Sequence, residues 1–301
     1  MTQPGDAAAR NSPSLSTFSI VAYDPAGPEW GVAVQSRFLA VGAIVPWARF
    51  RAGAVATQAR GNVSFGPQGL SLMGKGLSAQ ETLDHLLAGD DRQESRQVGL
   101  VDAQGATASY TGAECRSWAG SLCGTHYSVQ GNLLHDAATL EAMARAFEDG
   151  TGELADRLVA SLAAGQQAGG DRRGQQAAAL LVVRAQGSYG PDDDRYVDLR
   201  VDDAPQPIDQ LQALLGLHRL LYIPPEPDEW APVEGKLARD LQRVLRRAGH
   251  YAGPITGDYD KSTGQALASL MAIENLEERF QEAEGLIDRR AVAMLRRRYG
   301  M

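Results

Sequence analysis

The chain has 301 residues, which at about 100–200 residues per domain leaves room for two domains. Hydrophobic residues make up 44% and charged residues 22%, an ordinary globular composition. The formal net charge of -8 argues against a general nucleic-acid binder, which usually carries a basic face. Because no apolar run of about 18 residues occurs, we expect neither a membrane span nor a membrane partner.

Residues 1–16 are polar and contain scattered Gly, Pro, Ser and Asn, a composition that predicts a disordered leader or propeptide. They do not show the charged and apolar regions of a secretory signal, which favours a cytoplasmic protein. The two cysteines, Cys115 and Cys123, are too few for a disulfide framework. A single bridge between them stays open, because a strand-turn-strand could bring them close together.

Paired strands open the first predicted domain, residues 17–223. TFSIVAYD (17–24) and WGVAVQS (30–36) predict a β-hairpin, because both are rich in β-formers and a PAGPE turn separates them. A second pair of strands is expected at 41–47 and 52–58. Small residues and few charges indicate that these strands are buried on both faces.

Helices are expected in the middle of this domain. Ser78 followed by Glu81 is a capping box, which predicts a helix beginning there. A hairpin turning at 103–105 follows, and then two short extended segments and two amphipathic helices near 136–149 and 152–165. The domain closes with two strands and a helix, at 177–186, 196–202 and 208–222.

This order of elements predicts an α+β fold. Paired strands, paired helices and paired strands again are typical of a layered antiparallel domain and not of β-α-β alternation. The proline-rich segment PPEPDEWAP (224–232) predicts a stiff linker. Residues 233–301 predict a small all-α module with three helices, at 233–249, 260–275 and 286–299.

Several common chemistries find no support. GLSLMGKG (69–76) nearly matches a phosphate-binding loop, but Gly76 stands where a magnesium-binding hydroxyl is needed. DYDKSTG (258–264) resembles a calcium loop, but Thr263 and Ser269 occupy positions that need Gly and Glu. The histidines lack the spacing of a zinc site. We therefore expect neither a metal nor a cofactor.

The start of the first domain carries the strongest motif. Thr17 begins a strand, a hairpin follows, and Ser36-Arg37 end the returning strand, an arrangement that resembles the N-terminal-nucleophile (Ntn) hydrolases such as proteasome β subunits. The chain is more closely similar to an Ntn-hydrolase-like family, domain of unknown function 1028, over about residues 17–222. The resemblance rests on TFSIVAYD, GVAVQSRFLAVGAIVPWAR, GAVATQARGNVSFGPQGL, YSVQGNLL and GGDRRGQQAAALLVV. It implies a four-layer αββα sandwich.

The resemblance also implies a catalytic group. In an Ntn hydrolase the hydroxyl of the N-terminal residue attacks, and the α-amine of the same residue is the base. The ordinary pKa of an α-amine is about 7.7–8.0, so neutral amine is available near neutral pH. For Thr17 to act in this way, the bond from Ser16 to Thr17 must be cleaved. The alternative is an ordinary β-branched residue that starts a strand, and Ser19 is a weaker candidate nucleophile.

Six further residues, from the first three of these motifs and from the VQGN segment, are candidate site residues beside Thr17. Ser36 and Arg37 end the strand paired with the one that Thr17 begins, so Arg37 could tune the amine or hold a substrate carboxylate. Neutral amides near a strand end suit an oxyanion or a substrate amide, as do two amides that flank a glycine. These amides are Gln58, Asn62, Gln130 and Asn132. Turn-capping and surface roles are the alternatives.

Asp171 and Arg173 lie in the glycine-rich segment GGDRRGQQ (169–176). Arginine beside exposed backbone N–H groups suits an anion site. Asp171 could hydrogen-bond the free amine of Thr17. The alternative is a buried Asp–Arg ion pair that holds the loop in place.

The last segment, LARDLQRVLRRAGHYAGPITGDYDKSTGQALASLMAIENL (237–276), resembles a peptidoglycan-binding-like module, with Ser262 or Thr263 as an expected helix N-cap. Two functions stay open. One is an Ntn amidohydrolase that acts on a small amide. The other is a non-catalytic binding or scaffold protein that keeps the Ntn shell. For the module, contacts with a peptidoglycan fragment or with another copy of the chain in a homo-oligomer are both open.

Overall fold

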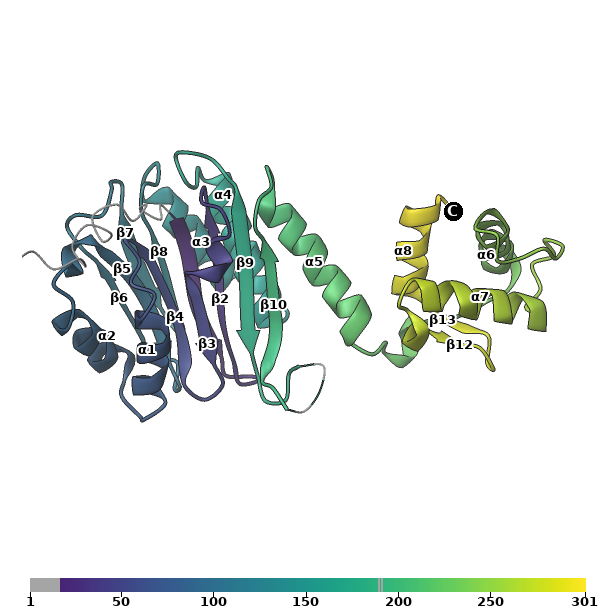
Figure 1. The fold of residues 1–301 in the computed structure, drawn as a ribbon, viewed down its shortest axis with the longest axis horizontal. Helices are drawn as coiled ribbons and strands as arrows, with labels where there is room; N and C mark the ends of the chain where they lie inside the picture. Colours follow the sequence, from purple (N-terminus) through teal and green to yellow (C-terminus); the bar gives the residue numbers. More distant parts are fainter. Residues whose placement is uncertain (1–16, 189, 191) are drawn as a thin grey trace, which may run out of the picture. The chain divides into compact units, whose positions relative to one another are not determined.

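The computed structural model describes residues 17–188, 190 and 192–301 and divides between Leu215 and Gly216 into two compact units (Figure 1). The expected leader, residues 1–16, lies outside the described residues. In the described part of the chain, no helix is both long enough and apolar enough to cross a bilayer.

The centre of the first unit is a six-stranded antiparallel sheet in the order β10-β9-β2-β1-β8-β7. Its strands are β1 (Thr17–Asp24), β2 (Glu29–Ser36), β7 (Gly120–Gly124), β8 (Tyr127–Gly131), β9 (Ala177–Val183) and β10 (Arg195–Val201). The β1–β2 hairpin is in the middle, and β1 also pairs with β8 along its other edge. Every residue of β2 is buried.

A second, four-stranded antiparallel sheet has the order β3-β4-β5-β6. Its strands are β3 (Pro46–Arg49), β4 (Gly53–Ala59), β5 (Arg96–Asp102) and β6 (Thr107–Thr111). The strand expected at 41–47 is wrong in its bounds, because a short 3₁₀ helix, η2 (Val41–Ala43), precedes β3. Burial on both faces was predicted for this pair of strands: β4 is buried throughout, but β3 is only partly buried, so the prediction is wrong for β3. Pro46 cannot donate a ladder hydrogen bond, which is why it stands at the first position of the strand.

The two sheets face each other, and helices cover their outer faces (Figure 1). Against the four-stranded sheet lie α1 (Phe65–Met73) and α2 (Ala79–Ala88), and η3 (Gln93–Ser95) follows α2. Against the six-stranded sheet lie α3 (Ala138–Glu148) and α4 (Leu154–Gln167). The predicted capping box at Ser78 and Glu81 is present at the start of α2. The near match to a phosphate loop lies mostly within α1, which buries Leu70 and Met73.

The second unit begins within α5 (Pro207–Tyr222), whose Leu220 packs into that unit's core. Its helices are α6 (Gly235–Arg247), α7 (Lys261–Ile273) and α8 (Arg289–Tyr299), with two 3₁₀ turns, η4 (Pro227–Glu229) and η5 (Glu277–Arg279). Three short strands complete it: β11 (Trp230–Pro232), β12 (Phe280–Gln281) and β13 (Leu286–Asp288).

The expectation of an all-α module is therefore wrong. β11, β13 and β12 form a three-stranded sheet, so the end of segment 224–232 belongs to the unit, and the last helix begins at Arg289, not at 286. Strands of two or three residues are too short to show a period in sequence. The N-cap of α7 is Asp260, which accepts a hydrogen bond from the N–H of Thr263.

Candidate functional site at the start of the first strand

Thr17 and Ser36 lie opposite each other on β1 and β2 and are both fully buried. Residues directly opposite in an antiparallel pair project to the same face of the sheet, so the hairpin itself brings the two hydroxyls together. The Thr17 hydroxyl donates to Ser36 Oγ at 3.2 Å. Two residues on, Ser19 projects to the same face and donates to Gln58 on the facing sheet, at 2.7 Å.

The backbone carbonyl of Thr17 is held from both sheets. It accepts the backbone N–H of Asn132 at 3.0 Å and Gln58 Nε2 at 3.4 Å. Gln58 is at the end of β4, and Asn132 follows β8 directly. Two of the candidate residues thus position the start of β1, with Thr17 fixed between them.

A network of side-chain amides fills the space between the sheets beside Thr17. Gln130 Nε2 donates to Ser19 Oγ at 2.7 Å, and Gln58 Nε2 donates to Gln97 Oε1 at 2.8 Å. The side chains of all four residues come from different strands and are fully buried. Gly99 makes room for this network, because a Cβ there would lie 2.0 Å from Gln130 Oε1.

Gln97 is the centre of the network and was not among the residues expected from sequence. Its Nε2 donates to Gly131 O at 2.8 Å, Thr111 Oγ1 at 2.9 Å and Gly120 O at 3.1 Å, while Asn132 Nδ2 donates to its Oε1 at 2.9 Å. A polar residue next to VGLV in a buried strand was the available sequence signal. Asn132 Oδ1 is buried and has no hydrogen-bond partner among the described residues.

Asp171 is engaged by the residues beside the site. Its fully buried carboxylate accepts the side chain of Arg173 at 2.7 Å and 3.1 Å and the backbone N–H groups of Arg173 and Arg37 at 2.9 Å and 3.2 Å. No hydrogen bond joins Asp171 to Thr17 in the described part of the chain. The observed geometry is the buried Asp–Arg pair that the sequence left open, and it fixes the chain immediately after Ser36.

Arg37 is exposed at this end of the six-stranded sheet. Its guanidinium donates to the backbone carbonyl of Gln175 at 3.3 Å, which ties it to the loop that contains Asp171. The side chain of Arg173 is 32% exposed. Both arginines therefore flank the start of β1, and both remain accessible at their outer edge.

Asn62 is directed elsewhere. Its Nδ2 donates to Asp90 at 3.2 Å, and its Oδ1 accepts from Ser64, so it holds the turn before α1. Burial raises the pKa of Asp90, but hydrogen bonds from Arg96, Arg92 and Asn62 outweigh burial and hold that pKa below its ordinary value. Asn62 therefore has the turn-capping role that was the alternative to a site residue. No described contact joins Asn62 to Thr17.

The cysteines form no disulfide in the structure. Burial raises the pKa of the Cys115 thiol to about 11, with the nearby carboxylates adding to the effect. The thiol is protonated at neutral pH, which is the opposite of what a nucleophilic cysteine needs.

The fold and this site define a layered α+β domain with a buried, hydroxyl- and amide-lined centre, followed by a small helical unit. A model of the family of unknown function DUF1028 matches residues 17–211, and the chain belongs to that family. Residues 221–295 match a peptidoglycan-binding-like domain.

A solved relative gives the same result. The chain is similar to a crystal structure of a protein from Silicibacter pomeroyi assigned to the same family, with 31% sequence identity and a TM-score of 0.62. The match covers 68% of this chain and 90% of that one. Among curated proteins, none matches the chain.

Proposed function

We propose that the first unit is an Ntn-type amidohydrolase that acts on a small amide, with Thr17 as the nucleophile. The observation that carries the proposal is the place of Thr17: it begins the central strand, its hydroxyl meets Ser36 at 3.2 Å, and its carbonyl is held from both facing sheets. The two facing sheets with helices outside them support an αββα sandwich of the Ntn kind.

The chemistry needs a free amine at Thr17. Hydrolysis of the bond from Ser16 to Thr17 adds water across one amide and leaves that amine. The neutral amine then takes the hydroxyl proton of Thr17 as Oγ1 attacks the substrate carbonyl, and the ammonium returns a proton to the departing amine. Water resolves the resulting ester and regenerates the hydroxyl. Both product groups come from the substrate and one water.

The remaining candidates take supporting roles in this proposal. Ser36 orients the Thr17 hydroxyl through its hydrogen bond. Gln58 and Asn132 position the strand start, and the unpartnered Oδ1 of Asn132 is available to accept from a substrate N–H. Asp171 acts as a positioning residue through the backbone of Arg37, since its carboxylate is held by Arg173.

One observation favours the non-catalytic alternative. Thr17 is fully buried, and a nucleophile must be reached by substrate. A protein that keeps this shell without removing its first sixteen residues would bind partners through its surface and through the peptidoglycan-binding-like unit.

Intact-mass measurement of the purified protein separates the two functions. A mass that corresponds to a chain beginning at Thr17 supports the hydrolase, and a chain that keeps Ser16 after prolonged incubation supports the alternative. A chain made to begin Met-Thr17 provides the second arm, because loss of the initiator methionine exposes the amine. On this form we expect Thr17→Ala to abolish amide hydrolysis while the melting temperature stays near that of the parent. Wild-type hydrolysis by the variant would contradict the assignment.

A further inference from the structure

A small polar pocket lies where β4 ends and where the chain leaves β6. Its volume is about 260 Å³. Its lining residues are Ala59, Arg60, Ser95, Glu114, Cys115 and Arg116. Ligand pockets for drug-sized molecules run from about 300 to 1,000 Å³, so this one suits a single small group and not a large cofactor.

Residues on two sides of the pocket are connected to Thr17 through the chain and through hydrogen bonds. On one side, Ala59 and Arg60 follow Gln58, whose Nε2 reaches Thr17 O. On the other side, the carbonyl of Arg116 accepts the N–H of Leu133 at 2.8 Å, and the preceding residue, Asn132, donates its N–H to the same Thr17 oxygen. Thr17 does not itself line the pocket. Ala59 is next in sequence to Gln58, and Arg116 is hydrogen-bonded to the residue after Asn132, and both Gln58 and Asn132 donate to the Thr17 carbonyl.

One lining residue, Ala59, and the residue bonded to Arg116, Leu133, have uncommon backbone conformations. Ala59 and Leu133 both have left-handed backbone, with φ of 63° and 54°, although neither is glycine. Such conformations cost energy and persist where the surroundings impose them. The N–H of Arg60 donates to Ser95 O at 3.1 Å, and the side chain of Arg96 bonds the Arg60 carbonyl, so the wall is fixed.

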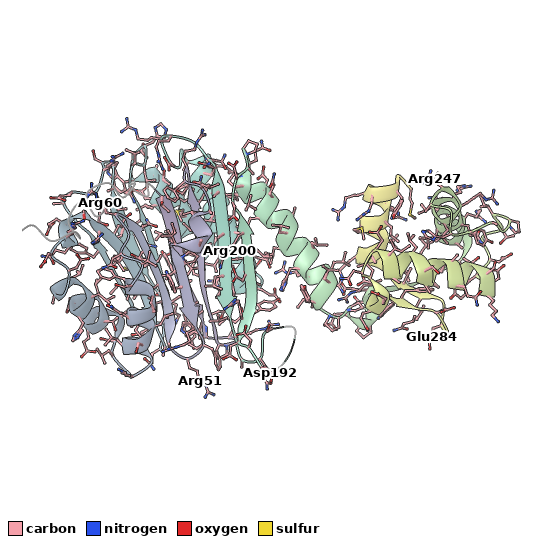
Figure 2. The ribbon with its side chains drawn as sticks, viewed as in Figure 1. Arg51, Arg60, Asp192, Arg200, Arg247 and Glu284 are labelled. Atoms are coloured by element: carbon pink, nitrogen blue, oxygen red, sulfur yellow. The ribbon has the colours of Figure 1, made fainter. Side chains whose placement is uncertain are left out.

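Two of the lining residues are arginines whose guanidinium groups can bind an anion. Arg60 and Arg116 form no ion pair with any described residue. Of the neighbouring acids, Asp90 pairs with Arg96 at 2.7 Å. Glu94 accepts only from the Tyr110 hydroxyl and the Ala113 N–H, and its charge, like that of Glu114, helps to raise the pKa of Cys115. Figure 2 shows Arg60 at the end of the sheets opposite Arg51 and Asp192.

The net charge of the lining residues indicates which class of anion the pocket would bind. Two arginines and Glu114 give the lining one net positive charge, and the Cys115 thiol, with its pKa raised to about 11, adds no negative charge at neutral pH. One net positive charge matches a single carboxylate better than a phosphate dianion. Arginine also presents paired N–H groups that match a carboxylate.

We propose that this pocket binds the carboxylate of the substrate, and so that the substrate is a small amide that also carries a carboxylate, such as an N-acyl amino acid. The inference rests on the proposed function for its link to Thr17. Arg60 and Arg116 are the binding residues.

The test is equilibrium binding by calorimetry with the full chain carrying Thr17→Ala, in which turnover is blocked. The probes are N-acetylglycine, N-acetylalanine and N-acetylglutamate, each paired with its uncharged amide. We expect at least one carboxylate to bind and its amide to bind about tenfold more weakly or worse, as loss of a charged hydrogen bond implies. Arg60→Gln and Arg116→Gln, each added to that background, should weaken carboxylate binding by a similar factor and leave amide binding unchanged.

Arg51→Gln is the matched control, because Arg51 is exposed and lies at the other end of the sheets (Figure 2). Equal binding of every acid and amide, no binding of any acid, or carboxylate binding that both pocket variants retain would each overturn the proposal. Failure of the proposed function gives a different result: carboxylate binding that depends on Arg60 and Arg116 together with no hydrolysis by the chain that begins at Thr17.

Discussion

The interior between the two sheets has two unlike halves. Near the β1–β2 turn, it is apolar: Val21, Trp30 and Val32 pack against Val101 of the facing sheet. Near the start of β1, it is lined with amides and hydroxyls that are just as completely buried. Apolar burial stabilises a fold directly, whereas a buried amide only recovers what its desolvation costs. Because the buried amides and hydroxyls are not needed to stabilise the fold, we look for the functional site in the polar half.

The largest effect on stability is expected in the apolar half. Trp30 is 3% exposed, stacks near Tyr23 and Phe50, and donates its ring N–H to Asp102 O at 2.9 Å. We expect Trp30→Ala to lower the free energy of unfolding by about 3–5 kcal/mol, since it removes a large buried side chain. Chemical denaturation measures this change. Leu122→Ala, at a side chain 41% exposed on β7, is the control and should change it by less than about 1 kcal/mol.

A paired test makes one chemical change at Gln97, inside the polar half, and at Gln35, which is buried on the opposite face of the six-stranded sheet. Gln97→Met removes the amide that five neighbouring groups use, and we expect a loss of about 2–4 kcal/mol because buried partners are left unpaired. Gln35→Met should instead raise stability by about 1 kcal/mol, because both amide atoms of Gln35 are buried without a partner among the described residues. Equal effects of the two changes would show that the network does not determine stability here.

A change at Asp171 is expected to lower stability less than the change at Gln97, and it tests the positioning role proposed for Asp171. Asp171→Asn removes the charge that holds Arg173, but Arg173 is 32% exposed and can turn to solvent, so we expect a loss of about 2–3 kcal/mol. Asp198→Asn, in the more exposed pairs with Arg195 and Arg200, should cost no more than about 1 kcal/mol. Thermal unfolding of both variants provides the comparison. An unchanged melting temperature for Asp171→Asn, together with impaired cleavage between Ser16 and Thr17, would instead support a direct catalytic role for its carboxylate.

Two acids outside the interior between the two sheets, Glu29 and Asp90, have pKa values that their surroundings shift in opposite directions. At the apolar end, burial raises the pKa of Glu29 despite the nearby Arg184. Stability from this group is full below its ordinary pKa of 4.5 and is lost as pH rises through the raised value. At the other end, Asp90 has a lowered pKa because its hydrogen bonds outweigh burial, so its stability is present above 3.8 and is lost as pH falls through the lowered value.

Unfolding measured against pH therefore separates these two acids, with the smallest expected effects of this series. Relative to Glu29→Gln, the wild-type chain should lose stability as pH rises from acid to neutral. Relative to Asp90→Asn, it should gain stability over the same range. If both variants followed the wild-type pH dependence, neither acid would have a pKa shifted by folding.

The sequence alone determined the strands of the first hairpin, the capped helix at Ser78 and the family. Alternation, β-rich composition and a capping box are local signals, and a hairpin places Thr17 opposite Ser36 wherever it forms. Of the candidate residues, Gln58, Gln130 and Asn132 lie around the start of β1, and local sequence patterns brought them to notice.

Only the tertiary structure decided which amides meet. Gln97 joins the site because β5 lies across from β1 on the facing sheet, and Asn62 leaves it because Asp90 and Ser64 hold its side chain elsewhere. The pocket of Arg60 and Arg116 brings together residues from the ends of two strands separated by more than fifty positions in sequence. Such pairings depend on which sheets face each other and in which register, and neither is encoded in any single segment of the chain. The same reason explains the short sheet of the second unit, whose strands exist only through their pairing.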